Sequence, residues 1–542
     1  MATLLGILLA GGGTSPAWAL VVTNASCSQQ AGNTLRYDCT ITTDVPADAW
    51  VRFGLGSPTD GVCTTVRATP TAQGGTLHAV TIYGLKPGED YDWDAQARPA
   101  GGGPLVSYGT CGSLAVDASL PTGAGSSGLA SLDISTAAPG GTRQASSFLT
   151  HYGCFKTGDA TETDQASEAL IIVDADGDIV WYQQPGDDLA IDGSGREGSR
   201  VVLEAVSLSR PLKRVLGIIN HEIIVKYDLA GNLVTLLCRD DGSGYCPGTT
   251  TVPDATFDDY VHHDVQRLST HIVALTAEDV DVDDVLNCDG NATTTQFPII
   301  VDGLVSFDTT SGTPLLDLEW DFTDVTGVTV DYTQASCPPS GGTSYWEDML
   351  EGEDYYHTNS FWFDAANQWM FSIHDLDAIY SIDSDITSGT YNQLIWTLAG
   401  DGTGDFSFVG GGLDEDFSTQ HAAYWDPDGN LTLFDNDWSG GPDSRGLVLE
   451  MDETAMTVEA IEQYTVEDIA ATNADCPMGG STLIMVGGNA FTACPQFSAA
   501  PKRAVVNEFD TTDSAVWTVE LECTTDYEPI SNAFRAYPNP WL

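Results

Sequence analysis

The chain has 542 residues, 42% of them hydrophobic and only 18% charged, so it is long enough to bury more than one core. The 78 Asp and Glu residues outnumber the 19 Lys and Arg residues, which gives a formal net charge of −59. This charge excludes nucleic acid as a partner, because a protein needs Lys and Arg to displace the counterions of a polyanion. Anionic lipid surfaces are disfavoured for the same reason.

The first residues have the pattern of a secretory signal. An apolar run covers residues 4–10, and Ala17 and Ala19 flank Trp18 in a small-x-small cleavage pattern, so we predict a signal peptide over residues 1–19. No other stretch approaches the roughly 18 apolar residues that a membrane span needs. We therefore expect an exported protein without a membrane span, either periplasmic or secreted. The sequence leaves its oligomeric state open.

Residues 20–112 alternate between strand-like stretches, such as 35–43 and 49–55, and turn residues. Residues 85–91, Leu-Lys-Pro-Gly-Glu-Asp-Tyr, resemble the tyrosine corner of a fibronectin type III domain. We predict a small fibronectin type III-like β-sandwich over residues 20–112. Residues 113–145 are rich in Gly, Ser, Ala and Thr, which predicts a flexible linker.

A two-stranded unit recurs beyond the linker: an apolar strand, a polar or acidic turn, and a second strand that often ends on Trp. It occurs six times, at residues 170–181, 223–237, 303–320, 378–396, 446–461 and 504–517. Hairpins that recur at intervals of roughly 50–80 residues are typical of a β-propeller, and an irregular sandwich would not explain the recurrence. We predict an all-β fold, with a six-bladed β-propeller over residues 146–542 preceded by the small β-sandwich.

All 12 Cys residues follow residue 19. An even number of Cys in an exported chain predicts disulfide bonds, and the sequence has no C-x2-C pair of the kind that favours a zinc site. We expect Cys238 to pair with Cys246 across a short loop and Cys476 to pair with Cys494. The sequence leaves the other pairings open.

Five of the nine His residues lie in three short segments that precede or join the hairpins: His262 and His263, then His357 and His374, then His421. The inner strands of different blades converge on the central channel of a propeller, so residues from separate blades can meet there. The alternative is that each His satisfies a buried strand or turn on its own. We favour a single site, because the segments recur at the spacing of the blades.

The chain resembles the bacterial arylsulfotransferases over most of residues 146–542. These proteins are six-bladed propellers that transfer a sulfuryl group between phenols. Taken together and in this order, the motifs that carry the resemblance are fairly specific: His263-Asp264, the His-x-Asn-Ser segment at 357–360, the Gln-His-x-Ala segment at 420–423, Leu-Phe-Asp-Asn at 433–436 and Ser444-Arg445.

The resemblance implies a reaction and a set of residues. His421 would be the nucleophile that is transiently sulfated, while His357 and His263 would bind or polarise the sulfuryl oxygens and one of the two would assist proton transfer at the phenol. The implied substrate-binding residues are His374, Asn359 and Arg445. A sulfuryl group would move from a phenolic sulfate ester to a phenol through sulfohistidine, without an adenylyl-sulfate donor, cofactor or metal. A neutral imidazole is a competent nucleophile near neutral pH, and positioned donors stabilise a loose transition state.

One position departs from the family pattern. The family has Ser-x-Arg where this chain has Ser372-Ile373-His374. A guanidinium offers a fixed fork of donors and a permanent charge, whereas an imidazole offers one or two donors and a charge that depends on pH. Sulfate binding would then be weaker, shifted to acidic pH, or taken over by Arg445 or Arg267; otherwise the donor is a different compound.

Two other interpretations remain open at this stage. Acidic residues at 174–178 and 279–284 could bind calcium in a structural role, although the first cluster has the Asp-Gly pattern of an ordinary hairpin turn. The chain could also be a non-catalytic exported protein for binding or adhesion. Such a protein has no use for His357 and His421, so replacing them would leave its behaviour unchanged.

Overall fold

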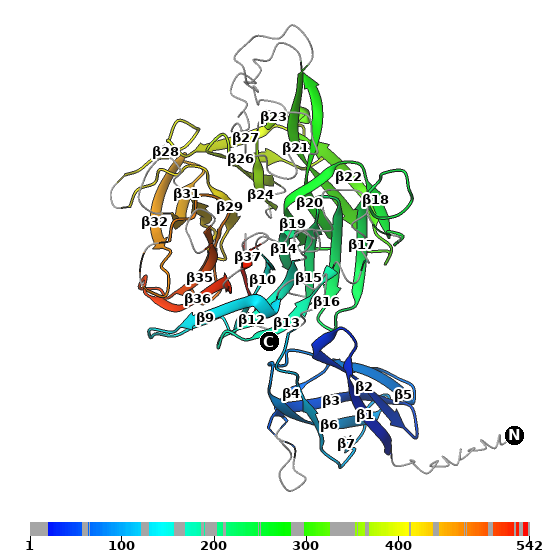
Figure 1. Cartoon of the computed structure of the whole chain (residues 1–542). Helices are drawn as coiled ribbons and strands as arrows, with labels where there is room; N and C mark the ends of the chain where they lie inside the picture. Colours follow the sequence, from blue (N-terminus) through cyan, green and yellow to red (C-terminus); the bar gives the residue numbers. More distant parts are fainter. Residues whose placement is uncertain are drawn as a thin grey trace, which may run out of the picture. The chain divides into compact units, whose positions relative to one another are not determined.

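The computed structural model describes residues 20–56, 63, 65–120, 129–156, 168–185, 189, 203–209, 213–247, 249, 251–282, 297–325, 353–354, 356–363, 368–410, 413–436, 444–470, 472, 474–496, 502–524, 527–529 and 535–539. The predicted signal peptide at 1–19 lies outside these residues, as do Cys288, Cys337 and the acidic residues 283–284. The chain divides into two compact units, residues 1–119 and 120–542 (Figure 1). Within the described part of the chain, no helix has the length and apolar character needed to cross a membrane.

The first unit contains two antiparallel sheets, ordered β1-β2-β5 and β4-β3-β6-β7, with β8 paired to β6. The strands are β1 (Val22–Gln30), β2 (Asn33–Thr43), β3 (Ala47–Leu55), β4 (Arg67–Ala68), β5 (Leu77–Ile82), β6 (Asp90–Pro99), β7 (Val106–Ser107) and β8 (Gly112–Ala115). β2 and β3 confirm the two stretches predicted at 35–43 and 49–55. Their alternating patterns bury residues such as Ile41 and Val51.

A tyrosine corner is present at the start of β6. The Lys86 main-chain N–H donates a hydrogen bond of 2.9 Å to the hydroxyl of Tyr91, whose ring is buried. Gly88 has φ +75° in the turn between them, a conformation that favours glycine. This contact confirms the corner that residues 85–91 predict, while the fibronectin type III assignment of the whole unit stays a prediction.

The second unit is a β-propeller. Six sheets of four or five strands follow one another among its described residues, and Figure 1 shows them around a common centre. In the order of the sheets, the strands are β10 (Ser147–Tyr152), β12 (Ala169–Asp174), β13 (Ile179–Gln183) and β38 (Tyr537–Asn539); β14 (Leu203–Ser209), β15 (Arg214–Ile219), β16 (Ile223–Asp228), β17 (Leu233–Arg239) and β18 (Ala255–Phe257); β19 (Tyr260–Leu268), β20 (His271–Val282), β21 (Phe297–Asp308), β22 (Leu315–Asp321) and β23 (Glu353–Asp354); β24 (Thr358–Phe363), β25 (Gln368–Ile373), β26 (Ala378–Asp383) and β27 (Leu394–Ala399); β28 (Ser407–Phe408), β29 (His421–Trp425), β30 (Leu431–Asp435), β31 (Arg445–Asp452) and β32 (Thr457–Thr465); and β33 (Ser481–Ile484), β34 (Ala490–Gln496), β35 (Arg503–Phe509), β36 (Ala515–Cys523) and β9 (Leu132–Ala137). The blade count of six stays a prediction with which these sheets agree.

All six hairpins predicted from the sequence are present. They are β12–β13, β16–β17, β21–β22, β26–β27, β31–β32 and β35–β36, and each belongs to a different sheet. The strands β14, β19, β24, β29 and β33 contact one another in succession, so they line the centre of the ring. Apolar side chains fill the space between neighbouring sheets, for example Trp320 stacked on Phe371 with ring centroids 5.4 Å apart.

Both ends of the second unit close the ring. β9 pairs with β36 in the last sheet, and β38 pairs with β10 in the first. The disulfide Cys154–Cys523 also joins two segments that are 369 residues apart. The prediction of a flexible linker over 113–145 is therefore wrong for residues 132–137. Their composition resembles a linker, but Leu132 and Ile134 alternate with polar residues and pair with a strand far along the chain.

The structure confirms the two predicted disulfides, Cys238–Cys246 and Cys476–Cys494. The described residues form three more: Cys27–Cys39 and Cys63–Cys111 in the first unit, and Cys154–Cys523 in the second.

Candidate active site

Four imidazole rings form a row at the centre of the second unit. The ring centroids of His263 and His357 are 5.0 Å apart, those of His357 and His374 5.0 Å, and those of His374 and His421 5.3 Å. His263 lies in β19, His357 directly before β24, His374 directly after β25, and His421 at the start of β29. Three sheets thus contribute to one cluster, and the structure brings together every His that the sequence analysis assigned to a site.

The backbone of three inner strands is irregular where these residues lie. The pairing of β19, β24 and β29 with the next strand shifts in register at the start of each strand. His263, His357 and Ala422 have φ values of +47°, +50° and +54°, in a region that residues with side chains rarely adopt. A bulge re-aims a side chain relative to a regular strand, and such strain concentrates at functional sites.

The contacts of His421 define its tautomer. Its Nδ1 lies 3.1 Å from the Thr419 carbonyl oxygen and 2.8 Å from Asn436 Oδ1. Both oxygens accept, because Asn436 uses its Nδ2 to donate to the carbonyls of Cys476 and Gly479. Nδ1 therefore carries the proton and Nε2 the lone pair, which accepts a 3.2 Å hydrogen bond from the Gly479 main-chain N–H.

Burial and nearby positive charge keep His421 neutral. The side chain is buried, and burial lowers its pKa well below the usual 6.5; His374, His357 and Arg535 lower it further, while the bond to Asn436 opposes them. A neutral imidazole with its lone pair on Nε2 is the nucleophilic form.

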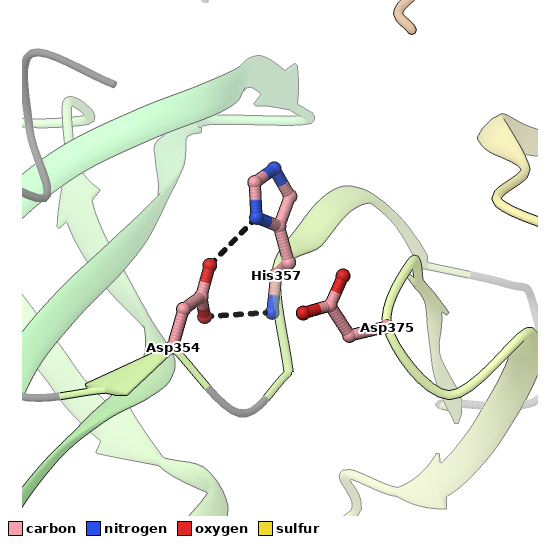
Figure 2. Close-up of side chains that lie close together, drawn as sticks. All are labelled: Asp354, His357 and Asp375. Atoms are coloured by element: carbon pink, nitrogen blue, oxygen red, sulfur yellow. Dashed lines mark hydrogen bonds and ion pairs between the residues drawn. The ribbon is translucent and has the colours of Figure 1, made fainter. Parts of the chain in front are cut away.

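His357 lies against a buried carboxylate, as Figure 2 shows. Its Nδ1 is 2.6 Å from Asp354 Oδ2, and its main-chain N–H donates to Asp354 Oδ1 at 3.1 Å. Burial alone would lower the pKa of His357, but Asp354, together with Asp375 and Asp302, outweighs burial and raises the pKa to about 10. His374 has a similar contact, with its Nδ1 2.5 Å from Asp375 Oδ1.

His262 fixes the orientation of His263. His262 Nε2 lies 3.0 Å from the Thr276 carbonyl oxygen and 3.3 Å from Asp302 Oδ1, so it carries a proton; in a neutral His262 the Nδ1 then accepts the 2.7 Å hydrogen bond from His263 Nδ1. The lone pair of a neutral His263 is therefore on Nε2. Burial, followed by the neighbouring His262 and His357, lowers the pKa of His263 well below 6.5.

Asn359 binds the backbone on both sides of His421. Its Nδ2 donates to the Gln420 carbonyl oxygen at 2.7 Å, and its Oδ1 accepts from the Ala422 N–H at 3.2 Å. These bonds hold the strand that carries His421 against β24. The prediction that Asn359 binds substrate stays a prediction, and its contacts show a side chain that positions His421.

Arg445 and Arg267, which the sequence analysis considered as replacements for the family's Arg, contact residues outside the row of imidazoles. The guanidinium of Arg445 binds Asp435 at 2.9 Å, Gln463 at 2.9 Å and the Asp416 carbonyl oxygen. Arg267 lines a cavity of about 640 Å³ together with Trp362, Tyr424, Trp425 and other residues near the far ends of the inner strands. The contacts of Arg445 thus hold it among acidic and polar side chains of β30 and β32.

Comparisons with known proteins bear on what this cluster does. A sequence profile described as Arylsulfotransferase (ASST) matches residues 142–530. The chain belongs to the arylsulfotransferase family. Membership supports aryl sulfotransferase activity in general and a small-molecule substrate.

Matches to solved structures are weak. They include a streptogramin B lyase (10% identity, TM-score 0.30, covering 72% of this chain and 98% of the other) and the β-propeller domain of Myceliophteria thermophila Cps50 (Swd1) (10% identity, TM-score 0.29, covering 68% and 84%). Identities and scores at this level say nothing about activity. A search of curated proteins found no match.

Arg535 is a buried cation that the sequence analysis did not identify. The side chain of Arg535 is only 1% exposed. Its Nη1 lies 2.9 Å from Asp264 Oδ1 and 2.7 Å from the Tyr424 hydroxyl. Its Nη2 donates a hydrogen bond to the Asn359 carbonyl oxygen. Burial disfavours the charge, but Tyr424 and Asp264 raise the pKa of Arg535 above its usual value. The only signal for Arg535 in the sequence is that Lys and Arg are rare, with 19 in the whole chain.

Proposed function

We propose that this protein transfers a sulfuryl group from a phenolic sulfate ester to a phenol through His421. The observation that supports this most strongly is the neutral His421, whose Nδ1 donates to Asn436 and whose Nε2 carries the lone pair within a row of imidazoles. In the first step Nε2 gives up its hydrogen bond from the Gly479 N–H and bonds to sulfur as the bond from sulfur to the aryl oxygen breaks, and the released phenolate takes up a proton from water. In the second step an acceptor phenol loses its proton as its oxygen bonds to sulfur and the S–N bond breaks.

The other imidazoles have distinct roles in this proposal. His357 Nε2–H and His374 donate hydrogen bonds to the sulfuryl oxygens, where the charge of a loose transition state collects. His263, with its lone pair on Nε2, accepts the proton of the acceptor phenol and returns it to the leaving phenolate in the reverse direction. Asn359 and Asn436 are positioning residues, because they hold the backbone and the ring of His421.

We also propose that the protein works outside the cytoplasm, in the periplasm or as a secreted protein. The described residues form five disulfides, which is typical of an oxidising compartment. A nucleotide sulfate donor is not needed, because the sulfate ester of a phenol supplies the sulfuryl group directly.

The dependence of kcat/KM on acidic pH tests whether His421 is neutral. The pKa of His421 lies well below 6.5, so the nucleophile stays neutral as the pH falls through that value. We expect kcat/KM for 4-nitrophenyl sulfate to stay within about twofold between pH 8 and pH 6 and to fall only at lower pH. In a ping-pong reaction this parameter reports the donor step alone.

The profile is read beside circular dichroism at each pH, so that acid unfolding is separated from protonation of the site. A rate that halves near pH 6.5 while the fold is intact would show that the nucleophile has an ordinary pKa. That result would contradict the buried, neutral His421 on which the proposal depends.

A further inference from the structure

Two carboxylates and one imidazole converge next to the row of His residues. Asp354, His357 and Asp375 each offer one ligand atom, and the three atoms lie within 4.8 Å of one another. Figure 2 shows the two carboxylates on either side of the His357 backbone, with the ring above them. Asp354 comes from β23, His357 from the segment before β24, and Asp375 from the turn after β25. We propose that these three residues bind one divalent transition-metal ion, Zn²⁺ or Mn²⁺.

Charge favours a cation at this place. The side chains of Asp354 and Asp375 are only 5% and 14% exposed, and Asp302 nearby is fully buried. Gathering carboxylates away from water is costly unless positive charge compensates them. His357 and His374 already contact Asp354 and Asp375, and one divalent ion would bring two positive charges to both carboxylates at once.

The ligand atoms are of the right kind and are held in place. Mixed imidazole and carboxylate ligands suit Zn²⁺ and Mn²⁺ better than Ca²⁺, which prefers oxygen alone. The His357 main-chain N–H binds Asp354 Oδ1, which leaves Oδ2 and His357 Nδ1 facing each other at 2.6 Å. A metal ion would replace the proton between these two atoms, which must then separate. His374 binds Asp375 Oδ1 and orients it, as outer hydrogen bonds commonly do for metal ligands.

Such an ion would also serve the transfer reaction, a step that rests on the function proposed above. The Nε2 of His357 lies on the side of the ring away from both carboxylates (Figure 2), so it still presents an N–H when Nδ1 binds metal. The ion would add a fixed positive charge behind that donor and strengthen its bond to a sulfuryl oxygen.

A second acidic cluster provides a matched control. Asp174, Asp176 and Asp178 also lie close enough to one another to hold an ion. They form a hairpin turn in which Asp174 Oδ1 accepts hydrogen bonds from the main-chain N–H groups of Asp176 and Asp178, and Asp176 is exposed. This geometry supports the turn that the sequence analysis favoured, and these carboxylates are not joined by an imidazole.

The test is isothermal titration of the chelator-treated, full-length protein with ZnCl₂ and with MnCl₂. We expect binding of one ion per chain. Asp375→Asn and Asp354→Asn should each weaken binding at least tenfold, because each removes a ligand. Asp176→Asn should bind as the wild type does. Thermal unfolding by circular dichroism shows whether each variant is folded. If Asp354→Asn does not fold, Asp375→Asn alone still tests the metal site.

The outcomes separate this inference from the proposed function. Absence of stoichiometric binding, equal binding by Asp375→Asn and wild type, or loss of binding only in Asp176→Asn would overturn the metal site. If transfer proceeds at the same rate without bound metal, the proposed transfer function is supported, and the proposal that the ion assists transfer is overturned. If one metal ion binds per chain but neither the metal-loaded nor the chelated protein transfers a sulfuryl group, the metal site is supported and the proposed function is overturned.

Discussion

The variant His421→Ala should lose phenol-dependent release of 4-nitrophenol from 4-nitrophenyl sulfate, with a fall in kcat of roughly 10³-fold or more. Removing the nucleophile removes the covalent intermediate, and no rearrangement of the remaining rings restores it. The measurement is the absorbance of 4-nitrophenol with and without added phenol. Intact-protein mass spectrometry of wild type mixed with donor alone should show one added sulfuryl group, which is absent in the variant.

His271→Ala is the matched control for this experiment. His271 lies at the start of β20, where its side chain is 36% exposed and 2.9 Å from Asp317. Its removal should leave the rate unchanged, which shows that loss of an imidazole as such is harmless. Wild-type activity in His421→Ala would refute the assignment of the nucleophile. Inactivity of the wild type itself with this donor, over the whole pH range, would favour the interpretation as a binding or adhesion protein.

Arg535→Met should lower the free energy of unfolding of the second unit by about 3–5 kcal/mol. The substitution leaves the carboxylate of Asp264 buried without the guanidinium that lies 2.9 Å away. It also removes donors to the Tyr424 hydroxyl and the Asn359 carbonyl oxygen. The measurement is scanning calorimetry together with urea unfolding followed by circular dichroism.

Arg214→Met is the control for the stability measurement. Arg214 pairs with Asp228 at 3.7 Å in the same unit, but its side chain is 32% exposed. A pair that water screens contributes at most about 1 kcal/mol. The double variant Arg535→Met with Asp264→Asn should recover part of the loss, because the buried charge is then gone. Equal, small effects of Arg535→Met and Arg214→Met would show that the buried pair carries no special energy.

Local features of this protein could be predicted from its sequence. Each of the six hairpins could be predicted, because two apolar strands and the turn between them lie within about 25 consecutive residues. The same holds for the tyrosine corner at Tyr91 and the disulfide Cys238–Cys246, whose partners are 8 residues apart. The convergence of His263, His357, His374 and His421 followed from the repeat, since equivalent positions of successive blades face one channel.

Features that join distant parts of the chain could not be predicted, because they depend on how the sheets are arranged in space. β9 looked like a linker because its partner, β36, lies almost 400 residues further along, and strand pairing over such distances leaves no local pattern. The contacts of Arg535 with Asp264 and Tyr424 arise because the chain end returns to the first sheet through β38. The bulges that aim the imidazoles, and the approach of Asp354 to His357, depend on how neighbouring sheets pack. Hydrophobic periodicity records which face of a strand is buried, and packing alone decides which side chains meet.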